Sequence, residues 1–337
     1  MTTATASVHN GQYSGFGRLC GVQLVTLDDI KAAADRIRDV AVHTPLVPAT
    51  GWSDPERPLW IKPENLQPVG AFKIRGAYNT LARLDEPVRA RGVVAYSSGN
   101  HAQAVAYAAA AYGVPAHIVM PEETPTIKVD ATRARGAEVI LCGAGQREIV
   151  AAEVVERTGA VLVPPFDHPD VIAGQGTVGL EIARDLPDVQ NVLVPVSGGG
   201  LASGIGTAIR ALCPDARVYG VEPELAGDTT EGLRLGHRVD WSIEDRNRTI
   251  ADGLRSQPSD LTFAHLRKVV DGMITATEEE IRDAVRVLAF QAHLVAEPSG
   301  ATAFAAYLRK AVPPGRTVVV LSGGNVDRHA LLEILNG

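Results

Sequence analysis

One lysine of this chain stands where a turn rich in proline and glycine meets a predicted helix. The turn runs from Pro63 to Ala71, and Phe72-Lys73 comes directly after it. The positive end of a helix and partial burial both favour the neutral form of a lysine amine, which is the nucleophilic form. A surface lysine that merely opens a helix is the alternative, and this window alone fits it at least as well. Lys73 is therefore a candidate nucleophile that needs further support.

A second junction offers a site for an anion. Tyr96-Ser97-Ser98-Gly99-Asn100-His101 follows a predicted strand, and its hydroxyl groups and helix-start amides suit a carboxylate. An ordinary helix cap is the alternative, because Ser and Asn are favoured there in any case. His101 taken alone would more often be a structural histidine than a catalyst. The turn alone does not decide between these interpretations.

The third junction is rich in glycine. Ser197-Gly198-Gly199-Gly200-Leu201 lies between a predicted strand and a predicted helix, where missing side chains let backbone N–H groups close around a phosphate. Two nucleotide-binding motifs fail here. No Gly-Lys-Ser/Thr follows, and a G-x-G-x-x-G pattern read from Gly198 meets Ser203 in place of its last glycine. A tight packing turn remains the alternative to a phosphate site.

These junctions need a scaffold that brings them together, and the sequence predicts one. From about residue 22, short β-branched runs alternate with Ala-rich helical stretches, the pattern of β-α units in a largely parallel sheet. Strands are predicted at 59–62, 92–96, 116–120, 137–141, 160–163, 191–196, 217–221 and 316–321, and helices at 101–112, 126–135, 146–157, 172–185, 201–212, 278–292 and 300–311. A fourth junction, Ser322-Gly323-Gly324-Asn325, ends the last strand with a serine that could hydrogen-bond a ring. Ligands of such sheets bind beyond the carboxyl ends of the strands, where all these junctions lie.

The composition argues for a small-molecule ligand in a globular protein. Lys and Arg number 32 against 39 Asp and Glu, which gives a net charge of -7 and makes nucleic acid or an anionic membrane a poor partner. The chain has no basic start followed by an apolar core and no run of 18 apolar residues, so we expect neither export nor membrane insertion. The three cysteines, Cys20, Cys142 and Cys213, make no C-x-x-C pair, which fits a reducing cytoplasm.

Together the junctions provide one lysine, one carboxylate cradle, one phosphate cup and one ring partner, the parts that a pyridoxal phosphate site requires. On these motifs the chain resembles the threonine dehydratase and serine racemase branch of the fold-type II pyridoxal-phosphate enzymes, the group that includes the tryptophan synthase β subunit. The resemblance runs from about residue 25 to the C-terminus and includes the segments 164–177 and 297–301.

The resemblance implies a role for each junction. Lys73 would bind pyridoxal 5'-phosphate as a Schiff base beside Phe72, and Asn100 would donate to the phenolic oxygen of the cofactor. Ser322 would be the partner of the pyridine nitrogen, in place of the carboxylate found in other fold types. Such a serine leaves that nitrogen largely unprotonated, which suits short-lived carbanions that eliminate at once. The implied phosphate cup consists of Ser197, Gly198, Gly199, Gly200 and Leu201.

The implied substrate is a small hydroxy-amino acid. Lys73 would take its α-proton as general base, and loss of the β-hydroxyl would give a 2-oxo acid and ammonia, the reaction of a threonine/serine ammonia-lyase. Serine racemisation is one alternative, because serine racemases carry Ser at the position of Ser98, where many dehydratases have Ala. Dehydration of 3-hydroxyaspartate is another, and a catalytically silent binding protein is disfavoured by the complete set of site residues. The substrate carboxylate would contact Ser97, Ser98, Asn100, His101 and Ser256.

A divalent cation site is a further implication. Glu222 and Asp228 are carboxylates six residues apart, and hard oxygen ligands of this kind suit Mg²⁺ or Ca²⁺. Two acidic residues in a loop are usually a solvated surface, and the surrounding stretch 222–260 reads as irregular. Racemases of the family, however, bind a cation through a carboxylate, a carbonyl and a carboxylate at positions that match Glu222, Ala226 and Asp228.

The resemblance also implies the architecture. We expect two three-layer α/β domains with mainly parallel sheets, a small one at 86–168 inserted in a large cofactor-binding one at 21–85 and 169–337, with the cofactor between them. Residues 1–20 are polar and without periodicity and predict a flexible arm. Only about a dozen residues follow Asn325, so we expect no C-terminal regulatory domain. We also expect a homodimer.

Overall fold

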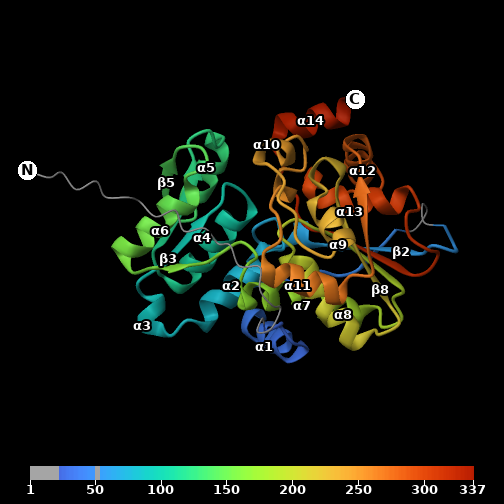
Figure 1. The fold of residues 1–337 in the computed structure, drawn as a ribbon, viewed down its shortest axis with the longest axis horizontal. Coiled ribbons are helices and arrows are strands. Elements are labelled where there is room, and N and C mark those ends of the chain that lie inside the picture. Colours follow the sequence, from blue (N-terminus) through green and yellow to red (C-terminus); the bar gives the residue numbers. More distant parts are fainter. Residues whose placement is uncertain (1–22, 50–53) are drawn as a thin grey trace, which may run out of the picture.

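The computed structural model describes residues 23–49 and 54–337, and in these ranges the strands form two sheets. The larger sheet has the order β1-β2-β10-β7-β8-β9, and its strands are parallel except for the antiparallel pair β1 and β2. The smaller sheet, β5-β4-β3-β6, is parallel throughout. Figure 1 shows the smaller sheet with its helices at the left and the larger sheet at the right. The predicted arm at 1–20 lies outside the described residues.

The strands lie close to where the sequence predicts them. The larger sheet consists of β1 (Val47–Pro48), β2 (Leu59–Pro63), β7 (Asn191–Pro195), β8 (Arg217–Pro223), β9 (Gly272–Ala276) and β10 (Thr317–Leu321). The smaller sheet consists of β3 (Val93–Tyr96), β4 (Ala116–Pro121), β5 (Glu138–Cys142) and β6 (Val161–Leu162). The edge strands β1 and β9 were not predicted. β1 has only two residues, and β9 is only partly buried over most of its length, so neither gives the apolar run of a buried strand.

The seven helices whose ranges were predicted lie close to those ranges, but several begin earlier. They are α1 (Leu27–Ile37), α2 (Lys73–Arg83), α3 (Glu86–Arg89), α4 (Asn100–Tyr112), α5 (Thr126–Arg133), α6 (Arg147–Thr158), α7 (Pro169–Asp185), α8 (Gly200–Leu212), α9 (Asp228–Leu235), α10 (Ile243–Arg246), α11 (Asp260–Val269), α12 (Glu278–Phe290), α13 (Pro298–Leu308) and α14 (Arg328–Asn336). α7 and α13 start early because a proline is tolerated in the first turn. The interpretation of 222–260 as irregular is wrong, because it contains α9 and α10, which are too short to show helical periodicity in the sequence.

Each sheet is covered by helices on both faces. In β10, Val319 and Leu321 enter a core with residues of α12 and α13, whereas Val318 and Val320 enter a second core with residues of α8. The same alternation occurs in β3, where Val94 faces a core that includes α6 residues and its neighbours face α4. This arrangement is the predicted three-layer α/β architecture. All strands of the smaller sheet lie within 86–168, and the domain boundaries themselves stay a prediction. No described helix is both long and apolar enough to cross a membrane.

Close helix packing sets the distance between the two most informative junctions. A Cβ on Gly204 of α8 would lie 2.4 Å from the carbonyl oxygen of Ile172 and 2.5 Å from the amide nitrogen of Gly176, both on α7. A Cβ on Gly174, also on α7, would lie 2.5 Å from the carbonyl oxygen of Arg75 on α2. Only glycine allows backbones to approach this closely. α7 therefore holds α2, which begins at Lys73, at a fixed distance from α8, which begins at the glycine loop.

A buried ionic cluster fixes α2 in place. The guanidinium of Arg75 donates to both carboxylate oxygens of Glu64, at 2.7 and 2.8 Å, and to both of Glu181, at 2.6 and 2.9 Å. Lys62 donates to Glu181 and to the carbonyl of Thr44, each at 2.5 Å. Arg75, Lys62 and Glu64 are at most 1% exposed. A cluster of two cations and two carboxylates with these bonds is balanced in charge, so the lysine at the start of α2 stands on a rigid support.

Removing a charge from this buried cluster should lower the free energy of unfolding far more than removing one from a surface ion pair. We expect Arg75→Met to lower the free energy of unfolding by about 3–5 kcal/mol, because Glu64 is left as a buried unpaired charge. Arg83→Met is the matched control: Arg83 lies on the same helix and is 2.9 Å from Asp170, but its side chain is 47% exposed. That change should cost less than about 1 kcal/mol. Urea denaturation measures both values, and equal losses would contradict a supporting role for Arg75.

Candidate active site

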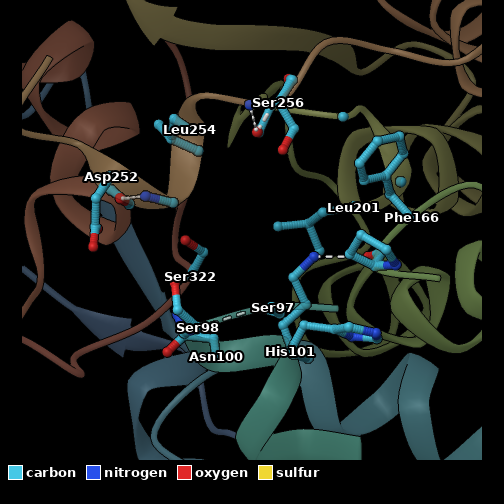
Figure 2. A pocket seen from close by; sticks show the side chains of 18 of the residues that line it. Ser97, Ser98, Asn100, His101, Phe166, Leu201, Asp252, Leu254, Ser256 and Ser322 are labelled. Carbon is cyan, nitrogen blue, oxygen red and sulfur yellow. Dashed lines mark hydrogen bonds between the residues drawn. The ribbon is translucent and has the colours of Figure 1, made fainter. Parts of the chain in front are cut away.

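A single pocket of about 440 Å³ collects the predicted cofactor and substrate residues. It lies at the carboxyl ends of strands of both sheets, where their loops meet. The predicted residues that line it are Phe72, Lys73, Ser97, Ser98, Asn100, His101, Ser197, Gly198, Gly199, Gly200, Leu201, Ser256 and Ser322. Figure 2 shows the turn from Ser97 to His101 along one side, with Ser256 across the cavity and Ser322 between them. The roles of these residues stay predictions.

Lys73 is the first residue of α2 and points into this pocket. Its amine donates to the carbonyl oxygen of Pro165 at 2.8 Å and lies 5.0 Å from the centre of the Phe72 ring. Burial lowers the pKa of Lys73 to about 8, while the charge of Glu297 acts in the opposite direction. A larger fraction of this amine is therefore neutral near physiological pH than in a lysine of ordinary pKa, and the neutral form is the one that acts as a nucleophile or a base.

The turn after β3 presents hydroxyl groups and the start of α4. The amide N–H of Gly99 donates to Ser97 Oγ at 3.2 Å, which shapes the turn, and α4 then begins at Asn100. The first amides of a helix have no carbonyl four residues earlier to bind, and they carry the positive end of the helix dipole. This corner of the pocket therefore has the donors that a carboxylate needs.

The ring of His101 acts differently from its neighbours. Its Nε2 lies 2.8 Å from the carbonyl oxygen of Val163, and because a carbonyl can only accept, Nε2 carries the hydrogen. Its Nδ1 is buried and has no hydrogen-bond partner among the described residues. Burial, helped by the charge of Lys73, lowers the pKa of His101 to about 3. The ring is neutral, its free nitrogen can only accept, and a carboxylate here would bind the main-chain N–H of residue 101 rather than the ring.

The glycine loop is shaped by an aromatic ring beneath it. A Cβ on Gly198 would lie 2.3 Å from the ring of Phe166, and Gly199 has a φ of +85°, a conformation that favours glycine. At the rim, Ser197 Oγ accepts from the amide of Ser256 at 3.0 Å and donates to its carbonyl at 3.2 Å. The loop opens α8, so its amide groups make a cradle with space for an anionic group and no side chain to fill it.

Ser322 directly follows β10 and lines the pocket together with the lysine. Its carbonyl accepts from the amide of Phe72 at 3.1 Å, and its side chain, in a residue only 4% exposed, has no hydrogen bond to any described residue. The hydroxyl is therefore available to a ligand. An amine, a glycine cradle, helix-start amides and a free buried hydroxyl are the donor set that a phosphorylated pyridine aldehyde requires, so the residues fit the predicted cofactor.

Comparison with known proteins agrees with this fit. A family profile described as "Pyridoxal-phosphate dependent enzyme" matches residues 37–323. The chain belongs to this family. Its cofactor is pyridoxal phosphate, and the predicted fold class, a fold-type II pyridoxal-phosphate enzyme, is confirmed.

Relatives with several names match over nearly the whole chain. An L-threonine ammonia-lyase of Thermotoga maritima is 47% identical over 93% of this chain and 79% of the relative. An L-threo-3-hydroxyaspartate ammonia-lyase of Saccharomyces cerevisiae is 39% identical over 93% of this chain and 97% of the relative. The structure of maize serine racemase matches with a TM-score of 0.88 and 38% identity, covering 93% of this chain and 98% of that one. The predicted branch of the pyridoxal-phosphate enzymes is thereby confirmed.

Several charged residues that line the pocket of this pyridoxal-phosphate enzyme were not predicted, among them Glu297, Lys128 and Asp252. Glu297 accepts from Asn100 Nδ2 at 2.6 Å, and Lys128 donates to Asp252 at 3.0 Å. Figure 2 shows Asp252 and this bond at the edge of the cavity. The segment beginning at Glu297 was recognised as typical of the family, but nothing in the sequence told which of its side chains faces the pocket.

The predicted metal ligands lie outside the pocket. Glu222 and Ala226 are 1% exposed and Asp228 is 4% exposed, at the end of β8 and the start of α9. Glu222 Oε1 accepts from the amide of Thr230 at 2.7 Å. Within the described ranges, no group of three or more His, Cys, Asp or Glu side chains could hold a metal. A cation here would depend on two carboxylates, a carbonyl and water.

Proposed function

We propose that this enzyme is an L-threonine/L-serine ammonia-lyase in which Lys73 carries the cofactor and acts as the general base. The observation that carries the proposal is the half-buried amine of Lys73, with its pKa lowered to about 8, in one pocket with the glycine cradle and the helix-start amides. The names of the relatives support the substrate class.

The bound cofactor supplies an electron sink for charge that develops on the substrate α-carbon. The residues of the chain supply position and proton transfer. The free Lys73 amine is a base matched to neutral pH, since burial has lowered its proton affinity. The α4 amides with Ser97 and Ser98 hold the substrate carboxylate, and Ser256 lies across the cavity as a further contact. Ser322 offers a neutral hydroxyl rather than a carboxylate to the ring nitrogen, which favours elimination over longer-lived carbanions.

The substrate is tested by one assay. Purified enzyme is given L-threonine, L-serine, D-serine and L-threo-3-hydroxyaspartate separately, and both 2-oxo acid and enantiomer are followed. Release of 2-oxobutyrate from L-threonine and of pyruvate from L-serine supports the proposal. Turnover of hydroxyaspartate alone would assign the chain to the second type of ammonia-lyase instead.

Lys73→Ala should fold but lose covalently bound cofactor. We expect its visible absorbance band to vanish and turnover of L-threonine to fall by at least about 10²- to 10⁴-fold, because nucleophile and base are both removed. Lys128→Ala is the control, since Lys128 also lines the pocket and its loss should leave the covalent bond intact. Borohydride reduction followed by peptide mapping locates the bond, and cofactor trapped on any lysine other than Lys73 refutes the assignment.

Serine racemisation is a second candidate activity, and Ser98 is the residue that favours it. Racemisation requires a proton donor on each face of the planar carbanion, and one lysine serves only one face. Ser98 lines the same pocket as Lys73 but comes from the turn before α4. A hydroxyl with an ordinary pKa is a poor base, so we propose elimination as the main reaction with slow racemisation beside it.

Ser98→Ala should separate these activities. We expect formation of D-serine from L-serine to stop, while much of the ammonia release from L-threonine remains, because elimination uses only the Lys73 face. Chiral chromatography and an ammonia assay measure the two rates in the same samples. Wild-type enzyme that makes no D-serine, or a variant that still makes it at the original rate, would show that Ser98 serves only in the helix-start turn.

We propose further that Glu222, Asp228 and the carbonyl of Ala226 bind Mg²⁺ or Ca²⁺. Two buried carboxylates near one another favour a divalent cation, and a cation that binds only the folded state stabilises it by mass action. Added Ca²⁺ or Mg²⁺ should raise the melting temperature by several degrees, and a chelator should reverse the change. Asp228→Asn should abolish the response, whereas Asp260→Asn, an exposed control, should keep it. Melting that is unaffected by either treatment in metal-free protein would exclude the site.

The setting of the enzyme also remains a proposal. We propose a homodimer in a reducing cytoplasm. Cys142 and Cys213 are unpaired and buried, as in a reducing compartment. Phe290, with 63% of its surface exposed, and Val295 with 51% are apolar side chains of the kind that a subunit interface covers.

A further inference from the structure

Glu297 has an unusual place for a glutamate. It is 6% exposed and stands at the N-cap of α13, yet its side chain makes no capping bond with that helix. Its Oε1 instead accepts from Asn100 Nδ2, which belongs to the start of α4 and is 197 residues away in the sequence. A buried carboxyl group that leaves its own helix start to bind a pocket residue is directed toward the site.

The backbone carbonyl of Val69 determines how the side-chain amides of Asn325 and Asn100 are oriented. Asn325 Nδ2 donates to the carbonyl of Val69 at 2.7 Å, and a carbonyl can only accept, so the NH₂ group of Asn325 must face it. The same NH₂ group donates to Asn100 Oδ1 at 2.8 Å. Asn100 must therefore present its oxygen to Asn325 and its NH₂ group to Glu297. That NH₂ group has a second hydrogen, which is left for a ligand in the pocket.

Close packing keeps the carboxyl group at this place. The amide of Glu297 donates to the carbonyl of Gly323 at 3.2 Å. A Cβ on Gly323 would lie 2.3 Å from Glu297 Oε1, and a Cβ on Gly300 would lie 2.2 Å from the carbonyl oxygen of Gly323. The two glycines thus make room for the carboxyl group against the turn that carries Ser322.

The charged groups around Glu297 come from three other elements. Burial is the main reason that the pKa of Glu297 rises to about 8, and Asp252 of the 3₁₀ turn at 252–254 adds to it. Lys128 of α5 and Lys73 of α2 act in the opposite direction, as does the bond from Asn100. The effect is mutual, because the charge of Glu297 also opposes the lowering of the pKa of Lys73.

We propose that Glu297 is a positioning residue: it engages one hydrogen of the Asn100 amide, whose orientation Asn325 sets, and it influences the proton affinity of the Lys73 amine. This inference rests on the proposed role of Lys73. Glu297 does not need to touch the reacting atoms. It determines which hydrogen of Asn100 faces the ligand and at what pH the lysine is free to react.

Two variants separate these two effects. Glu297→Gln keeps an oxygen that can accept from Asn100 but removes the charge, whereas Glu297→Ala removes both. The probe is pyridoxal 5'-phosphate added to full-length protein freed of cofactor, and the rate at which the visible absorbance band forms is measured from pH 6 to 10.

For the wild type we expect the capture rate to rise with pH, with a midpoint near the pKa of Lys73 of about 8. In Glu297→Gln the midpoint should move to lower pH by up to about one unit, because the carboxyl group of Glu297 ionises in the same pH range as Lys73, and in the variant its negative charge no longer opposes loss of the lysine proton. The band should keep the wild-type wavelength. In Glu297→Ala the midpoint should shift likewise, and the wavelength should shift too, because Asn100 has lost its acceptor.

Glu148→Gln is the matched control, since Glu148 also lines the pocket but does not act on the pKa of Lys73. Its midpoint should equal that of the wild type. An unchanged midpoint in Glu297→Gln, or a band at the wild-type wavelength in Glu297→Ala, would overturn the proposal. Lys73→Ala tests the assumption beneath it: if that variant still captures the probe at the same rate and pH, the assignment of Lys73 fails, and this result is distinct from a failure of Glu297.

Discussion

The guanidinium of Arg75 binds three parts of the chain whose relative positions determine the shape of the pocket. It binds Glu64 after β2, Glu181 near the end of α7 and, at 3.1 Å, the carbonyl of Val42. Lys73 is two residues away on the same helix, so this cluster determines where its amine lies. Charged groups of this kind add little net stability once their desolvation is counted. Here they specify one position for the start of α2, because any other position would leave a charge unpaired.

Three titratable side chains that line the pocket are buried wholly or in part, and burial disfavours their charged forms. The ring of His101 is neutral, the amine of Lys73 is partly so, and the carboxyl group of Glu297 holds its proton more tightly than usual. Water would favour the charged form of each. On the proposed assignment, the backbone amides of the glycine loop would hold the phosphate of the cofactor, and the amine of Lys73 would stay available for chemistry.

The pocket-lining residues could be predicted because each stands where a strand hands over to a helix. Parallel strands bring their carboxyl ends to one edge of a sheet, which gathers Lys73, Gly199 and Ser322 beside the larger sheet and places Ser98 at the corresponding edge of the smaller one. Sequence can reveal such topology through periodicity. The resemblance to a known family then gave each junction its chemistry.

The remaining features depend on contacts that no local pattern encodes. The bond between Glu297 and Asn100 spans 197 residues, and that between Arg75 and Glu181 spans 106. The neutral ring of His101 follows from its burial against Val163, which the sequence does not reveal. The helices within 222–260 were missed because a helix of eight or four residues is held by its surroundings more than by its own periodicity.

The order of strands in the larger sheet has a consequence for how the protein is made. β10 lies between β2 and β7, so the middle of that sheet is filled by residues 317–321, which leave the ribosome after every other strand. The smaller sheet uses only residues 93–162 and can be complete long before. Until β10 has been synthesised, the edges of β2 and β7 that later pair with it have no partner strand. Unpaired strand edges are prone to pair with the wrong partner. Ser322 directly follows the strand that closes this gap, so the pocket that it lines is completed in the same step that pairs the last open edges inside the sheet.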